Sequence, residues 1–300
     1  MVYLSKMSVF GLLNLFVVYI VWSSTYLAIR IAVTGGFEPF TLGAVRLFFA
    51  GLILFIVLII KRMNLRLNFY EFKIIFSTSM LMWVLGNGLI MWAEQNAASG
   101  LTALILGVTP ILASFLDSIF TKKMPSLISV FSLLLGFVGV FCLFIPKISN
   151  FSLIDIFSYS LVFISAFCWA VGAIIQRNNS LNMSVLTMSF YQSLFASIGF
   201  FLLSLVFHES YAMPSYNAVL ALWYLVIFGS VFAFTAYINA VKLLPINISM
   251  TYAYVNPVLA LFLGHIVLNE EINKFTIIGA LLIILGILGV FKDQFNKNKK

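Results

Sequence analysis

The residues of this chain that could do chemistry are polar side chains inside long apolar runs. Arg46 lies about two turns into the run 39–60, where its guanidinium could bind an anionic group such as a carboxylate. The alternatives for Arg46 are snorkelling to the lipid headgroups and a structural ion pair with Glu38 or Glu94. Because polar groups are costly in lipid, such residues usually face a cavity or a partner helix.

A second polar cluster precedes a proline in the run 246–268. Tyr252 and Asn256 are four residues apart, share one helix face and could both point into one cavity. Packing with interhelical hydrogen bonds is the alternative, and the sequence leaves both open. Thr109 before Pro110 repeats the pattern of Asn256 before Pro257. We expect each proline to fall mid-helix, where it removes a backbone hydrogen bond, as a fixed bend or as a hinge.

Other polar and aromatic candidates also lie within or at the ends of apolar runs. The remaining candidate solute contacts are Trp22, Ser23, Asn87 and Trp169. Both tryptophans lie deeper than the interfacial position that is common for this residue. Glu94, at the end of its run, is the candidate for proton coupling, although a carboxylate at a loop edge is more often simply solvated. Asp117 is expected to form a local salt bridge with Lys122 or Lys123, or to interact with the helix end.

Motifs typical of catalysis or metal binding do not occur in the sequence. It contains no HExxH, Walker A, GxSxG or CxxC pattern. His208 and His265 have no partners at ligand spacing, and Cys142 and Cys168 lie inside apolar runs as small buried residues. We therefore expect no enzyme, no metal site and no cofactor.

The composition requires a lipid bilayer as the solvent of this chain. It is 63% hydrophobic and 9% charged over 300 residues, with a mean hydropathy of +1.12, whereas soluble domains are about 25% charged. A transmembrane helix needs about 20 apolar residues. Ten such runs occur, at 8–33, 39–60, 72–93, 99–120, 126–146, 155–176, 184–207, 216–241, 246–268 and 274–291. The predicted fold is an all-α polytopic membrane protein with ten transmembrane helices.

The positive charges predict the orientation of the chain. The net charge of +8 could suggest nucleic acid, but 13 of the 17 basic residues fall on one side of the membrane if the N-terminus is cytoplasmic. Both termini are therefore expected in the cytoplasm, with the basic tail against anionic lipid. We expect a small-molecule substrate and the lipid bilayer as partners and no nucleic acid, and leave monomer or homodimer open.

The two halves of the sequence resemble each other. Residues 105–116 and 252–263 are identical at six of twelve positions, at an offset of 147 that also relates Trp22 to Trp169. Each half, 1–147 and 148–300, holds five predicted helices. Because five is odd, the second half enters the membrane from the opposite side, which predicts inverted-topology repeats of the kind found in transporters.

Five segments together resemble the EamA family of the drug/metabolite transporter superfamily. They are WSSTYLAIR at 22–30, GAVRLFFAG at 43–51, GNG at 86–88, SGLTALILGVTP at 99–110 and SMTYAYVNPVLALFLG at 249–264. The resemblance implies a central cavity lined mainly by the first, third, fourth, sixth, eighth and ninth helices, with alternating access. It also implies export of amino acids, other metabolites or drugs through a bacterial inner membrane. Because the second helix is not among those implied, we favour the structural alternatives for Arg46.

Some mechanisms are disfavoured by the residues that are missing. The first helix holds Asn14 but no carboxylate of the kind that small multidrug members use for cationic drugs and protons. No nucleotide-binding domain is present to drive transport with ATP. The alternatives kept are a carrier of phosphorylated or nucleotide-linked metabolites, a membrane-embedded lipid enzyme, and a non-transporting membrane sensor.

Overall fold

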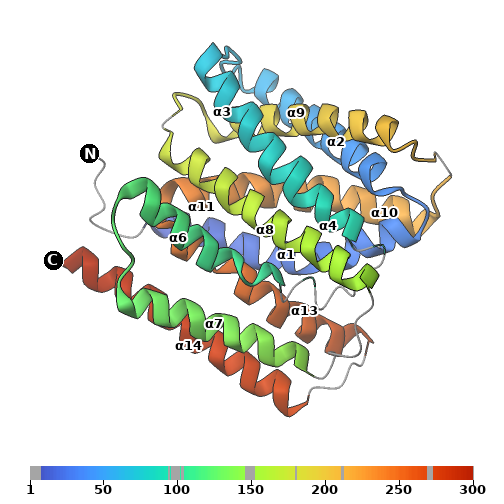
Figure 1. The fold of residues 1–300 in the computed structure, drawn as a ribbon. Coiled ribbons are helices and arrows are strands. Elements are labelled where there is room, and N and C mark those ends of the chain that lie inside the picture. The colour runs from blue at the N-terminus through green and yellow to red at the C-terminus, as the bar shows by residue number, and fades with distance from the viewer. Residues whose placement is uncertain are drawn as a thin grey trace.

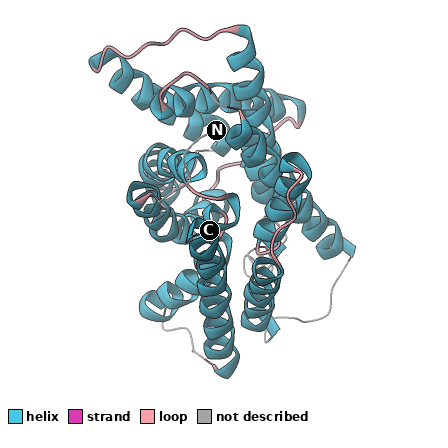
Figure 2. Ribbon diagram, turned by 90° about the vertical axis from the view of Figure 1, so that its left-hand side faces the viewer, coloured by secondary structure: helices cyan, strands magenta, loops and turns pink. Residues whose placement is uncertain are grey.

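All regular structure in the described residues of this computed structural model is helical (Figures 1 and 2). The structure describes residues 8–93, 95, 102, 105–145, 153–179, 181–210, 213–268 and 273–299. The helices are α1 (Val9–Thr34), α2 (Pro39–Ile60), α3 (Phe69–Ser79), η1 (Met80–Asn87), α4 (Gly88–Ala93), α6 (Thr109–Thr121), α7 (Leu127–Phe144), α8 (Leu153–Asn178), α9 (Val185–Val206), α10 (Tyr216–Tyr224), η3 (Leu225–Ala233), α11 (Phe234–Leu243), α12 (Ile246–Ser249), α13 (Tyr252–Leu268) and α14 (Lys274–Lys299).

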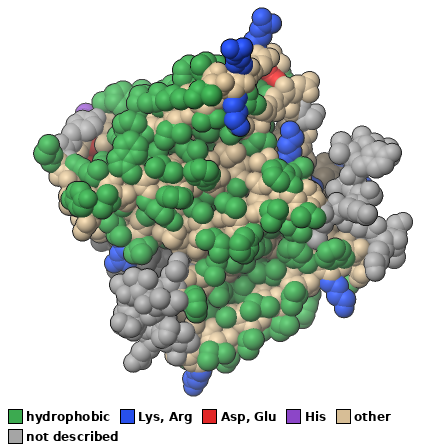
Figure 3. Space-filling model, turned by 180° about the vertical axis from the view of Figure 1, so that it is seen from behind, with side chains coloured by type: hydrophobic (Ala, Val, Ile, Leu, Met, Phe, Trp, Pro, Cys, Tyr) green, Lys and Arg blue, Asp and Glu red, His purple; other side chains and the backbone are tan. Residues whose placement is uncertain are grey.

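The chain is a multi-pass membrane protein. Within the described ranges, seven helices are long and apolar enough to cross a bilayer, and Thr109–Thr121 and Leu127–Leu143 are shorter apolar helices. Large apolar side chains such as Phe48, Phe201 and Leu285 are exposed. Figure 3 shows one face as a broad hydrophobic belt, with Lys and Arg mostly toward its edges. Such a surface is unfavourable in water and is solvated by lipid tails.

Several helices begin where the sequence supplies a capping side chain. Ser8, Asn68, Ser126, Ser184 and Ser215 each accept a hydrogen bond from a backbone N–H of the first turn that follows. These N–H groups have no carbonyl partner inside the helix, so the cap satisfies a donor at the membrane edge. The capping residues therefore fix where these apolar helices start.

Helices from distant parts of the sequence pack in pairs. In Figure 1, α7 and α14 lie against each other at one edge of the bundle, and α2 likewise packs along α9. Glycines permit the close approach of α7 and α14. A Cβ atom on Gly286 would lie 2.7 Å from the backbone N of Gly136, and one on Gly139 would lie 2.7 Å from the backbone N of Ile283. The α7–α14 contact is therefore a contact between backbones.

Two of the long helices contain a π-helical segment in their middle. Segment η1 joins α3 to α4 and packs on α8, whereas η3 joins α10 to α11 and packs on α1. The Gly86 carbonyl in η1 accepts a hydrogen bond from Ser165 Oγ at 2.6 Å, and the Gly229 carbonyl in η3 accepts one from Trp22 Nε1 at 3.2 Å. The widened turns thus offer carbonyl groups to side chains of neighbouring helices.

The two prolines differ in their placement. Pro257 lies inside α13, as expected. Pro110 is instead in the first turn of α6, and a turn at Gly107 and Val108 precedes that helix, so the prediction that Pro110 falls mid-helix is wrong. Proline is tolerated there because the first N–H groups of a helix have no intrahelical acceptor.

Candidate solute-binding site

A small cavity lies between the helices near the middle of the bundle. Its volume is about 60 Å³, well below the roughly 300–1,000 Å³ of pockets that hold drug-sized ligands. The walls come from helices of both halves of the chain. The lining residues are Trp22, Thr25, Tyr26, Ile29, Arg46, Trp83, Asn87, Ile90, Leu106, Thr109, Ser165, Trp169, Tyr252 and Ala253.

An aromatic cluster forms one wall of this cavity. The ring of Trp22 lies edge to face with Trp169 at a centroid distance of 5.6 Å and with Tyr252 at 5.0 Å. Tyr237 lies behind them, 5.0 Å from Trp22, and its hydroxyl accepts a hydrogen bond from Trp169 Nε1 at 3.0 Å. Edge-to-face packing fixes the ring orientations. The cavity therefore has a rigid, largely apolar wall.

The positive charge of Arg46 lies inside the same cavity. The side chain is only 3% exposed, and its Nε donates a hydrogen bond to Ser230 Oγ at 2.7 Å. Its Cζ lies 5.2 Å from the centroid of the Trp83 ring, within the range of a cation–π interaction. Among the described residues, no carboxylate pairs with Arg46.

Three lining residues carry buried polar atoms that lack a partner. Arg46 Nη1, Trp83 Nε1 and Asn87 Oδ1 have no hydrogen-bond partner in the described part of the chain. An unsatisfied buried polar atom costs about 1–3 kcal/mol, and more when it is charged. Two donors and one acceptor around one cavity are the groups that a polar ligand would satisfy.

Most of the residues predicted from the sequence lie together around this cavity. Trp22, Arg46, Asn87, Thr109, Trp169 and Tyr252 line it. Ser23 and Asn256 are buried but are not among the lining residues: Ser23 donates to the Ile20 carbonyl, and neither amide atom of Asn256 has a partner in the described residues. Glu94, the candidate for proton coupling, lies outside the described residues.

Two expectations about charged residues need correction. Arg46 does not snorkel, because its side chain is buried in the cavity wall, and no ion pair joins it to Glu38; a pair with Glu94 falls outside the described residues. Helix α2 therefore contributes to the cavity, in addition to the helices that the family resemblance implied as its main lining. Asp117 does not pair with Lys122 or Lys123. Its Oδ1 accepts instead from Arg177 Nη1 at 3.1 Å, across α6 and α8.

Residues that the sequence analysis missed lie on the same helix faces as those it found. Thr25 is three positions after Trp22, and Ser165 is four positions before Trp169, so helical spacing could have identified both as cavity residues. Ser230 and Tyr237 had no such signal. Their partners Arg46 and Trp169 are 184 and 68 positions away in the sequence.

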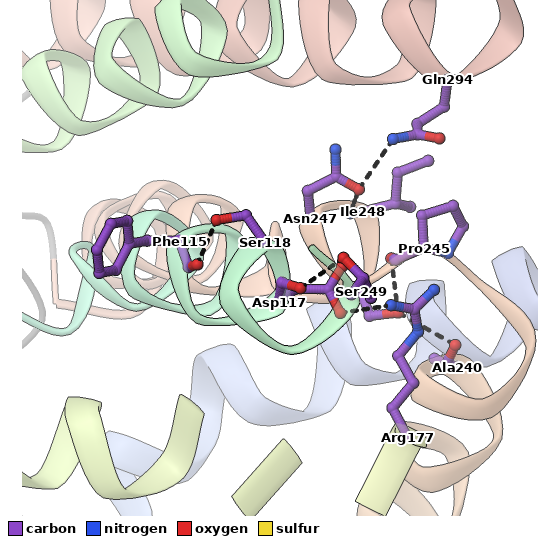
Figure 4. A network of polar contacts seen from close by, with 11 residues as sticks. Phe115, Asp117, Ser118, Arg177, Ala240, Pro245, Asn247, Ile248, Ser249 and Gln294 are labelled. Atoms are coloured by element: carbon purple, nitrogen blue, oxygen red, sulfur yellow. Dashed lines mark hydrogen bonds and ion pairs between the residues drawn. The ribbon is translucent and has the colours of Figure 1, made fainter. Parts of the chain in front are cut away.

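The ion pair between Asp117 and Arg177 belongs to a second polar region at the end of the bundle. Figure 4 shows it beside the short helix α12, where Ser249 Oγ donates to the carbonyl of Ala240 at 3.1 Å. In the same view, Gln294 Nε2 donates to Asn247 Oδ1 at 3.3 Å. Both members of the ion pair line an open pocket of about 400 Å³. The pair therefore ties α6 to α8 at this end of the bundle.

Comparison with known sequences identifies the family. The sequence profile described as the EamA-like transporter family matches residues 9–145 and again residues 156–292. The chain belongs to the EamA-like transporter family. Family membership indicates that the protein is a membrane transporter, and the match covers both halves.

Individual relatives of this EamA-like chain agree with that assignment. The uncharacterized inner membrane transporter YedA of Escherichia coli is 27% identical over 286 residues, which cover 94% of this chain and 90% of YedA. The uncharacterized transporter YoaV of Bacillus subtilis is 24% identical, covering 96% and 98% of the two chains. A solved crystal structure matches this chain with a TM-score of 0.80 at 18% sequence identity. The match covers 95% of this chain and 98% of the other, and it shows that the two share a fold.

Proposed function

We propose that this chain is a secondary transporter that moves a small metabolite through the central cavity by alternating access, in the direction of export. The observation that carries the proposal is that both halves contribute walls to one cavity with three unpartnered polar atoms. A site at the interface of two repeats can be exposed to either side of the membrane by rocking one repeat against the other. The candidate substrates are amino acids, related compounds or small drug-like molecules.

The architecture proposed with this function is ten transmembrane helices in two inverted five-helix repeats. The two family matches are related by the same offset of 147, since residue 9 corresponds to 156 and residue 145 to 292. The π segments support the proposal as well, because η1 near α8 and η3 near α1 occupy corresponding places in the two halves.

The topology that follows places both termini in the cytoplasm of a bacterial cell, with the protein in the inner membrane. Green fluorescent protein fused after Lys300 should fluoresce, and alkaline phosphatase at the same position should be inactive, because each reporter works on only one side of the membrane. The opposite pattern would contradict the proposed orientation.

Transport itself is tested by counterflow exchange in proteoliposomes. Purified protein should exchange labelled solutes from an amino-acid panel and a metabolite extract with saturation, whereas liposomes without protein should not. Replacing Trp22 by Ala should reduce the exchange, because it removes the ring that contacts Trp169, Tyr237 and Tyr252. A folded protein that exchanges none of these solutes would favour the sensor alternative.

Coupling to protons is proposed through Glu94. If it couples, a pH gradient should change the exchange rate of the wild type, and Glu94→Gln should abolish that response while leaving counterflow without a gradient intact. A gradient response that survives in Glu94→Gln would exclude this residue as the coupling group.

A further inference from the structure

We infer that the Arg46 side of the cavity is a built site for the carboxylate of a small organic monoanion, with the aromatic wall receiving the apolar part of that molecule. The inference rests on the proposed transport function and names the substrate class for it. Three features of the buried Arg46 guanidinium support the inference: its charge, the contacts that hold it in place, and the polar atoms around it.

The charge of Arg46 lacks a counter-ion in the described structure. The residue is 97% buried and lines the cavity, yet its described hydrogen-bond partner is the neutral hydroxyl of Ser230. A buried charge without an opposite charge is strongly unfavourable. A bound anion would compensate this charge, and Nη1 is the unpartnered donor that would meet it.

The guanidinium is held in place by neighbours that leave Nη1 available. Ser230 accepts from Nε and in turn donates to the Leu225 carbonyl at 3.0 Å, which fixes the hydroxyl as an acceptor for arginine. Gly229 leaves room for the Nη2 atom of the guanidinium, because a Cβ atom on Gly229 would lie 3.1 Å from Arg46 Nη2. The π segment η3, which packs on α2, thus orients Arg46.

The polar atoms around the guanidinium favour particular hydrogen-bonding groups in the ligand as well as a negative charge. Trp83 packs against the guanidinium, and its Nε1 is a second unpartnered donor. Arginine and indole N–H groups together suit the two oxygens of a carboxylate. Asn87 Oδ1 adds an unpartnered acceptor, which suits a ligand that carries a hydrogen-bond donor elsewhere.

One guanidinium favours a monoanion over a phosphate ester. A phosphate carries about 1.5 to 2 negative charges at neutral pH, and a buried excess charge would remain beside a single arginine. The cavity volume of about 60 Å³ also favours a small solute. The aromatic wall of Trp22, Trp169 and Tyr252 is suited to a flat or apolar group attached to the carboxylate.

The test uses acids that are each compared with compounds of the same ring carrying a different polar group. Benzoate, cyclohexanecarboxylate and 3-phenylpropionate are each compared with the matched amide and amine, and phenyl phosphate is added. Binding to the purified full-length protein in detergent is measured by titration calorimetry and by the rise in its thermal midpoint. We expect at least one carboxylate to bind, and its matched amide and amine to bind at least tenfold more weakly.

Two variants distinguish the effect of losing the Arg46 charge from a general effect on folding. Arg46→Gln should lower the carboxylate affinity at least tenfold, whereas Arg66→Gln, the same change at an exposed arginine, should leave it unchanged. If Arg46→Gln does not fold, the comparison of acid with amide on the wild type still decides. The inference is overturned if no carboxylate binds, if amides bind equally well, if phenyl phosphate binds better than every carboxylate, or if a folded Arg46→Gln keeps the affinity.

Transport and binding can fail separately. Carboxylates that bind through Arg46 but are not exchanged in proteoliposomes would leave the site assigned and contradict the transporter proposal. Saturable exchange of neutral or cationic solutes, unaffected by Arg46→Gln, would support transport and overturn the carboxylate site.

Discussion

Trp22 and Trp169 meet edge to face beside the central cavity, with ring centroids 5.6 Å apart and an interplanar angle of 79°. They are related by the offset of 147 that relates the two halves of the sequence. Two equivalent residues can touch only where the halves face each other. The cavity wall is therefore also part of the contact between the halves, so movement of one half relative to the other would change the shape of the site.

The hydroxyl of Tyr237 is predicted to hold Trp169 in this arrangement. Tyr237→Phe removes the acceptor of Trp169 Nε1 and leaves a buried donor unsatisfied, which should cost about 1–3 kcal/mol of stability. The thermal midpoint in detergent should fall, and counterflow should slow. Tyr216→Phe, at a tyrosine that is 76% exposed, is the matched control and should change neither. An unchanged midpoint in Tyr237→Phe would show that the hydrogen bond does not stabilise the wall.

The Asp117–Arg177 ion pair is predicted to limit further opening of its end of the bundle, beyond the pocket that the two residues line. Its side chains are 21% and 22% exposed, so the loss of the pair should cost about 1 kcal/mol and raise the population of the open form about fivefold. The measurement is the labelling rate of a cysteine at Ser114, which lines the same pocket and is 8% exposed, with Cys142 and Cys168 replaced by serine. Asp117→Asn should accelerate labelling.

A charge reversal provides the control for that experiment. Asp117→Arg combined with Arg177→Asp restores an ion pair in the opposite sense and should return the labelling rate toward that of the parent. If the single and the double variants label equally fast, attraction between these two residues does not control access.

The contact between α7 and α14 is predicted to depend on the absence of a side chain at Gly286. A Cβ atom at Gly286 would lie 2.7 Å from the backbone N of Gly136 and 2.7 Å from the carbonyl of Ser132, so Gly286→Ala forces the backbones apart. Overpacking of this kind costs about 1–3 kcal/mol. Thermal unfolding should show a lower midpoint for Gly286→Ala. Leu285→Ala, at the preceding residue, which is 55% exposed, should have a much smaller effect.

The observed position of the Arg46 guanidinium is predicted to require the absence of a side chain at Gly229. In Gly229→Ala the new methyl group would lie 3.1 Å from Arg46 Nη2 and 3.2 Å from Thr25 Cγ2, which is tighter than ordinary contact. The guanidinium would have to shift, so the affinity for a carboxylate that binds the wild type should fall severalfold, as measured by calorimetry. Gly51→Ala on α2 is the control, because its nearest neighbour is Ser193 Cβ at 3.7 Å. If Gly229→Ala and Gly51→Ala lower the carboxylate affinity equally, the loss reflects a general effect on α2 and its neighbours.

The sequence alone determined the membrane setting and most of the candidate residues. Continuous apolar runs and capping residues are local features, and they located α1, α2, α8 and α9 to within a few residues. A polar side chain inside an apolar run is costly in lipid, so Arg46 and Asn87 could be selected from the sequence. Trp169 could be selected because it lies deeper in its run than the interfacial position that is common for tryptophan.

Only the tertiary structure decided which of these residues share a cavity and what they contact. In a bilayer, the face of a helix that meets lipid is as apolar as the face that meets protein, so the sequence does not reveal how each helix is rotated. Arg46 is buried in the cavity wall, and its hydrogen-bond partner Ser230 lies 184 positions away in the sequence. Asp117 similarly pairs with Arg177 rather than with its neighbours in sequence. Such contacts depend on which helices pack together and at what depth, which is information that only the assembled bundle contains.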